Sequence, residues 1–129
     1  MPHVIVHGIP PGIDPTALEN LWNAIRTSVA AIGELAIEKD QVTVWFPPDL
    51  LITGLGEELL ITVEGLHKKH PEEGKPGRTP AVQNMIANAI LDSVQHTLLD
   101  HAHLPDCAKV EIYVKKFDTD KDGYASWQK

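Results

Sequence analysis

Residues 1–8 read Met1-Pro2-His3-Val4-Ile5-Val6-His7-Gly8, and the rest of the chain is organised around this stretch. The β-branched run followed by a glycine predicts a short strand that is closed by a turn. Proline is tolerated at the first position of a strand, where a ladder donor can be missing. If Met1 is removed, the mature chain begins with a free secondary amine on Pro2. That amine is the most distinctive chemical group that the sequence offers.

The overall composition describes one globular domain over residues 1–129. This length allows one core and is too short for two independent ones. The formal net charge of −7 argues against nucleic acid or an anionic membrane as a partner. Cys107 is the single cysteine, which excludes an internal disulfide and fits a reducing compartment. Because no apolar run has membrane length and no signal pattern opens the chain, we expect a cytoplasmic protein.

A first strand–helix–strand unit is predicted over residues 1–48. The prolines and glycine at 9–13 form a rigid turn, and Asp14-Pro15 pairs an N-cap with proline at the first helical position. A strand at 41–46 ends at two prolines. Between them, apolar residues recur every three or four positions up to Gly33 and predict one buried helix face: Leu18, Leu21, Trp22, Ile25, Val29 and Ile32.

A second unit with the same order is predicted over residues 57–117. Leu59–Gly65 and Lys109–Phe117 are strand-like. Between them, Thr79-Pro80 repeats the cap-then-proline device and opens a helix with one apolar face. The segment from His67 to Thr79 is predicted to be a long exposed loop. Residues 118–129 are a polar tail.

Local matches between the two units indicate a duplication: VIVHG with ITVEG, DP with TP, and VTVW with VEIY. Strand–helix–strand units favour parallel pairing within each unit and a right-handed crossover. We therefore predict an α/β fold in which two β-α-β units form a four-stranded sheet with two helices on one face.

The sheet face away from the helices carries an unusual mixture of side chains. It is too aromatic for a plain solvated surface and too polar for a second core. We interpret it as a subunit interface with a pocket at its edge, and an ordinary solvent-facing surface is the alternative. The residues with this strand parity are His3, Ile5, His7, Thr43, Trp45, Thr62, Glu64, Glu111 and Tyr113.

The Met-Pro-strand opening and the doubled unit resemble the tautomerase superfamily. That superfamily includes 4-oxalocrotonate tautomerase, 5-carboxymethyl-2-hydroxymuconate isomerase, macrophage migration inhibitory factor and small bacterial proteins that open Met-Pro-His. The resemblance implies a cofactor-independent isomerase that is a homotrimer, with its amino-terminal proline near a subunit boundary. In the family the neutral proline nitrogen takes a proton from the carbon beside a carbonyl and returns it elsewhere.

The resemblance makes Pro2 the candidate catalytic base for keto–enol proton transfer on a small carbonyl acid. Burial lowers the pKa of an amine, and a base works best when its pKa lies near the operating pH. The family's arginines after the first strand and within the second strand are absent here: the stretches read Ile9–Ile13 and Gln41–Val44. Arg78, beside the start of the second helix, is the candidate anion ligand, whereas Arg26 is expected to be a surface or ion-paired residue.

His3, Trp45 and Tyr113 complete the candidate substrate-binding set.

The alternative function is a catalytically inactive trimeric binding or scaffold protein of the same fold, which would contact a partner through the loop from His67 to Thr79. No metal site is expected, because His3 and His7 are about 13 Å apart along one strand. The stretch from Asp118 to Gly123 matches only the opening half of a calcium-binding loop.

Overall fold

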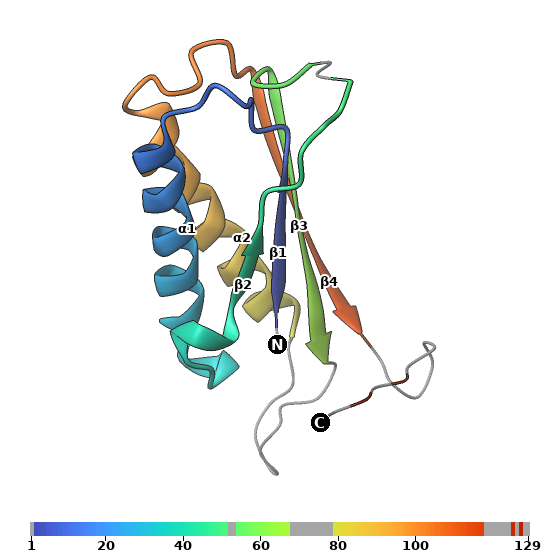
Figure 1. The fold of residues 1–129 in the computed structure, drawn as a ribbon. Coiled ribbons are helices and arrows are strands. Elements are labelled where there is room, and N and C mark those ends of the chain that lie inside the picture. Colours follow the sequence, from blue (N-terminus) through green and yellow to red (C-terminus); the bar gives the residue numbers. More distant parts are fainter. Residues whose placement is uncertain (1, 52–53, 68–78, 118–124, 126, 128–129) are drawn as a thin grey trace.

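The structure is a computed structural model of the chain and describes residues 2–51, 54–67, 79–117, 125 and 127. One four-stranded mixed sheet is covered on one face by two helices (Figure 1). The predicted α/β fold class, with both helices on the same face, is confirmed. Among the described residues, no helix is long and apolar enough to span a membrane.

Each half of the chain contributes two strands and one long helix. The first half contains β1 (His3–His7), α1 (Pro15–Ala30), the 3-10 helices η1 (Gly33–Leu35) and η2 (Lys39–Gln41), and β2 (Thr43–Trp45). The second half contains β3 (Glu58–His67), α2 (Pro80–Val94), the π-helical turn η3 (Gln95–Leu99) and β4 (Lys109–Phe117).

The sheet has the order β2-β1-β3-β4. β1 pairs with β2 and β3 pairs with β4 in parallel, as expected for two strand–helix–strand units. The two units meet where β1 and β3 run antiparallel, with His3 opposite Glu64 and His7 opposite Leu60. β1 and β3 are therefore the central strands, and β2 and β4 are the edges.

The predicted helix starts are confirmed at the atomic level. The Asp14 side chain accepts a hydrogen bond from the Thr16 amide at 3.0 Å, and the Thr79 hydroxyl accepts one from the Val82 amide at 3.3 Å. In both helices a proline follows the cap, where its missing N–H leaves no helical bond unmade.

Some predicted bounds were wrong. α1 ends at Ala30 instead of continuing to Gly33, and the chain turns into η1, which still buries Leu35. The second strand begins at Thr43, because residues 39–41 form η2, in which the Glu38 amide donates to the Gln41 side chain at 2.8 Å. β3 is longer than predicted, since its last residues, Leu66 and His67, still pair with β4.

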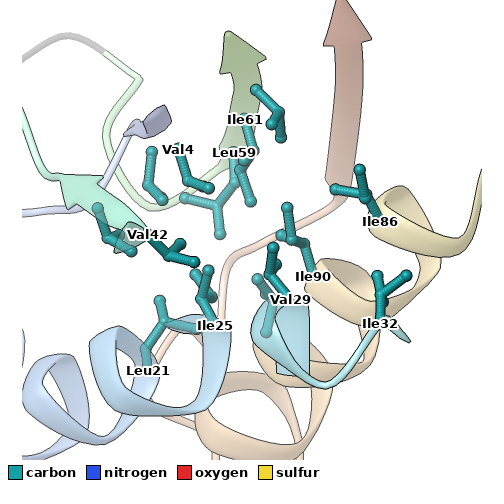
Figure 2. Close-up of a cluster of buried hydrophobic side chains, with 14 of the residues drawn as sticks. Val4, Leu21, Ile25, Val29, Ile32, Val42, Leu59, Ile61, Ile86 and Ile90 are labelled. Atoms are coloured by element: carbon teal, nitrogen blue, oxygen red, sulfur yellow. The ribbon is translucent and has the colours of Figure 1, made fainter. Parts of the chain in front are cut away.

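The core lies between the sheet and the two helices (Figure 2). Val4 and Ile61 from the central strands face Ile25 of α1 and Ile90 of α2, and all four side chains are fully buried. The periodicities of two along the strands and of three to four along the helices bring these apolar side chains onto facing surfaces.

Gly8 is required where β1 ends. Its φ of +100° lies in the region that favours glycine, and a Cβ at this position would stand 2.3 Å from the carbonyl oxygen of Glu58. The Gly8 carbonyl in turn accepts a hydrogen bond from the Gly56 amide at 2.8 Å. The glycine thus allows the chain to turn away from β1 directly beside β3.

Candidate functional site

Pro2 is buried at the start of β1, on the central part of the sheet. It stands two residues before Val4 and four before Val6, both fully buried against the helices, so it continues the inward-facing series. Its carbonyl oxygen accepts a hydrogen bond from the Thr43 amide at 3.1 Å. Pro2 is therefore held at the helix-covered side of the sheet.

The amino-terminal end of α2 lies at the same end of the sheet as Pro2 (Figure 1). β3 runs antiparallel to β1 and ends beside the start of β1. α2 then begins at Pro80 and runs back along the sheet. The free amides and the positive dipole end of a helix favour negative charge at such a position. Arg78, which stands one residue before the cap Thr79, lies outside the described residues.

The other predicted site residues lie on the opposite face of the sheet. His3, Trp45 and Tyr113 are exposed there, and about half of the surface of the residues Trp45 and Tyr113 is open to solvent (53% and 52%). The outer face therefore carries the mixture of aromatic and polar residues that strand parity predicts.

Strand register places Trp45 and Tyr113 at the two ends of one row that crosses the sheet. Ile5 of β1 is opposite both Trp45 and Thr62, and Thr62 is opposite Tyr113. Three strand spacings separate the two aromatic residues, which is about 14 Å. A single chain thus brings together neither the two aromatic side chains nor either of them with Pro2.

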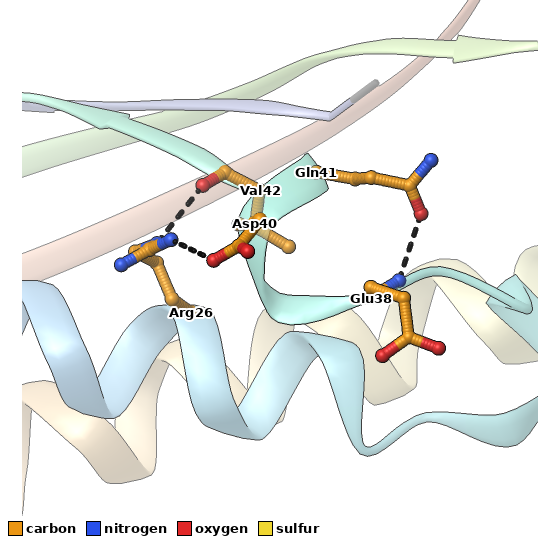
Figure 3. Close-up of polar contacts among 5 residues, drawn as sticks. All are labelled: Arg26, Glu38, Asp40, Gln41 and Val42. Carbon is orange, nitrogen blue, oxygen red and sulfur yellow. Dashed lines mark hydrogen bonds and ion pairs between the residues drawn. The ribbon is translucent and has the colours of Figure 1, made fainter.

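Arg26 is ion-paired, as expected, and joins α1 to the segment before β2 (Figure 3). Its Nη2 lies 3.1 Å from Oδ1 of Asp40, and its Nε donates to the carbonyl oxygen of Val42 at 3.3 Å. The guanidinium also lies 4.2 Å from the ring centroid of Trp22. Three groups occupy this arginine, so it is unavailable as a substrate ligand in this conformation.

A polar network covers the outer face of β4. The Tyr113 hydroxyl donates to Oε2 of Glu111 at 2.8 Å, and Nζ of Lys109 pairs with Glu111 and with Glu58. The hydrogen bond from Lys109 lowers the pKa of Glu111, and the hydrogen bond to Glu111 raises the pKa values of Lys109 and Tyr113. Sequence reasoning missed this network, although the i, i+2 spacing in a strand already puts residues 109, 111 and 113 on one face.

Replacing Glu111 with Gln is expected to lower the pKa of Tyr113, because the neutral amide no longer favours the protonated phenol. Tyrosine-selective carbon-13 NMR titration measures this change. Glu64→Gln, on the same sheet face but outside the network, is the control and should leave the pKa of Tyr113 in place. An unchanged titration in the Glu111 variant would contradict the network.

The raised pKa of Tyr113 also links the stability of the fold to pH. The hydrogen bond from the protonated Tyr113 stabilises the folded state below the ordinary tyrosine pKa. This stabilisation is lost as the pH rises through the pKa of Tyr113 in the folded protein.

Two hollows lie at the other end of β1 from Pro2. The first has a volume of about 600 Å³ and is lined by the outer-face residues His7, Leu60 and Glu111 together with Asp49. The second has a volume of about 320 Å³ and is mainly apolar, with Phe46 and several prolines in its wall. Pro2 lines neither of them.

The sequence also contains possible metal ligands and one cysteine. Within the described ranges, no three His, Cys, Asp or Glu side chains are grouped so that they could hold a metal ion. Cys107 is half-buried, and its Sγ donates to the carbonyl oxygen of Lys109 at 3.6 Å. The calcium-loop stretch at 118–123 lies outside the described residues.

Comparison with known proteins gives structural neighbours only. No protein-family model and no curated protein matches the sequence. Pt0534 inactivated by 2-oxo-3-pentynoate superposes with a TM-score of 0.62 at 17% identity, covering 95% of this chain and 91% of that one. A symmetric trimer of fused 4-OT gives 0.60 at 19% identity, with coverages of 95% and 91%. 5-Carboxymethyl-2-hydroxymuconate delta-isomerase gives 0.59 at 14% identity, with coverages of 100% and 89%.

These neighbours are tautomerase superfamily proteins, and the likeness extends over almost the whole chain. The resemblance suggested by the Met-Pro-strand opening is thereby confirmed at the level of the fold.

Proposed function

We propose that this chain is a tautomerase-like enzyme in which Pro2, freed by removal of Met1, is the general base for keto–enol proton transfer on a small carbonyl acid. The observation that carries the proposal is the burial of Pro2 at the start of the central strand β1, in a fold shared with an isomerase and with 4-OT. No cofactor is needed, because the amine both accepts the proton and returns it.

The surroundings of Pro2 suit this role. Burial disfavours the protonated amine and so keeps the base available near neutral pH. The start of α2 lies at the same end of the sheet, and its positive dipole end favours the binding of a substrate carboxylate there. We assign Arg78, one residue before the cap of that helix, to the substrate carboxylate.

We further propose that the protein is a homotrimer. The exposed Trp45 and Tyr113 on the outer face support an interface between copies, and fused 4-OT forms trimers. Because Pro2 faces the other way, His3, Trp45 and Tyr113 would reach a Pro2 only across a subunit boundary. Light scattering after size exclusion should give three times the chain mass. A monomer would contradict a site that is shared between subunits.

Covalent labelling tests the proposed base. The ketone of 2-oxo-3-pentynoate activates its triple bond toward nucleophilic amines, and this reagent inactivates Pt0534. With a neutral amine at Pro2, peptide mapping by mass spectrometry should locate one adduct on Pro2 before any lysine reacts. The urea-unfolded chain is the control and should lose this selectivity. Labelling confined to lysines would contradict the proposal.

A further inference from the structure

We infer that Arg26 is a positioning residue for Pro2 and acts through the peptide group that joins Val42 to Thr43. The role in catalysis rests on the proposed function, whereas the coupling itself rests on geometry alone. The carbonyl of this peptide group accepts a hydrogen bond from Nε of Arg26 at 3.3 Å (Figure 3). The N–H of the same peptide group donates to the carbonyl oxygen of Pro2 at 3.1 Å.

The planarity of the peptide group links the two hydrogen bonds. In a trans peptide the C=O and the N–H point in opposite directions and cannot rotate independently. When Arg26 fixes the direction of the Val42 carbonyl, it therefore also fixes the direction in which Thr43 donates to Pro2. A charged donor on the carbonyl polarises the peptide group and strengthens its N–H as a donor.

Arg26 is well placed to act as the fixed end of this linkage. Only 13% of its side chain is exposed, whereas its ion-pair partner Asp40 is 96% exposed. The ring of Trp22 supports one face of the guanidinium at 4.2 Å. An ion pair with a carboxylate that is open to water adds little stability. The hydrogen bond to the carbonyl of the buried Val42 is thus the contact through which Arg26 most clearly fixes the backbone.

Pro2 needs such support because, once Met1 is removed, it is the first residue of the chain and no preceding residue holds it in place. The bond from Thr43 holds its carbonyl and so limits how far the residue, with its pyrrolidine ring and nitrogen, can move relative to β2. A general base must stay within a fraction of an ångström of its working position, since small misplacements lower the rate strongly. Loosening the Val42–Thr43 peptide group should therefore lower kcat without changing substrate affinity.

The experiment compares Arg26→Gln with the wild type by two readouts. The first is amide hydrogen exchange at Thr43 measured by NMR, which needs no activity; we expect exchange to be about tenfold faster, because the donor is less firmly held. The second is phenylenolpyruvate ketonisation; we expect kcat to fall about tenfold while KM stays within about twofold.

Two variants serve as controls. Asp40→Asn removes the exposed charge but keeps the bond to Val42, and it should leave kcat within about twofold of the wild type. Ile90→Val weakens the core at α2 without changing any group of the Arg26–Val42 linkage, and it should do the same. If Arg26→Gln does not fold, Arg26→Lys provides the test, since its single ammonium cannot hold Asp40 and Val42 in the same fork geometry. Smaller losses in both readouts are then expected.

The possible failures are distinguishable. Unchanged exchange at Thr43 would overturn the coupling, whatever the activity. A raised KM with unchanged kcat would identify Arg26 as a substrate ligand and would also overturn it. Faster exchange with unchanged kcat would overturn the positioning role, provided that Pro2→Ala is inactive. If Pro2→Ala keeps the full rate, the proposed function fails, and the exchange measurement still decides the coupling.

Discussion

Replacing Pro2 with alanine is expected to lower the rate of phenylenolpyruvate ketonisation by at least about 100-fold, since a positioned general base contributes that much or more. The variant still has an amine once Met1 is removed, but it lacks the ring that fills the buried position at the start of β1. Its nitrogen is then more mobile and better hydrated, and it spends more time protonated. Steady-state kinetics on the purified protein measure the loss.

Pro15→Ala is the matched control for this substitution. Pro15 is also a proline at the start of an element, but it is exposed and opens α1 at the opposite end of the sheet. Its replacement should leave the rate within about twofold of the wild type, because alanine is a good helix former and an N1 position has no bond to lose. Equal rates for Pro2→Ala and the wild type would remove Pro2 from the mechanism and favour the scaffold function.

The largest stability effect is expected from Ile90→Ala, at about 2–5 kcal/mol. The Ile90 side chain is fully buried between α2, α1 and the sheet (Figure 2), so truncation leaves a cavity. Leu91→Ala removes a similar apolar group from the next residue of the same helix, where 39% of the residue is exposed. That control should cost less than about 1 kcal/mol. Urea unfolding followed by circular dichroism measures both, and equal losses would contradict the assignment of the core.

Much of the fold could be predicted because its signals are local. Asp14-Pro15 and Thr79-Pro80 mark both helix starts in the sequence, and the structure shows the expected cap bonds. The alternation along Lys109–Phe117 also gave the bounds of β4. The bounds of β2 could not be predicted, because the 3-10 turn at residues 39–41 depends on a local hydrogen bond between Glu38 and Gln41 rather than on periodicity.

Less of the candidate site could be predicted, because it depends on contacts between distant segments. Nothing in the sequence links Arg26 to Val42, sixteen positions away, or Thr43 to Pro2. Strand parity correctly put Trp45 on the outer face, but the separation of Trp45 from Pro2 follows from the sheet order. The missing family arginines could be read directly from the sequence, whereas the group that replaces them depends on three-dimensional placement.

Nitrogen-15 NMR titration of Pro2 in the purified protein tests the central claim most directly. The proposal predicts that the nitrogen titrates, which requires that Met1 has been removed. It also predicts a pKa below that of the same amine in a short peptide with the sequence Pro-His-Val-Ile, because burial disfavours the ammonium form. An amide nitrogen, which Pro2 has if Met1 is retained, does not titrate and cannot be a base. That result, or a pKa equal to the value in the peptide, would contradict the role of Pro2.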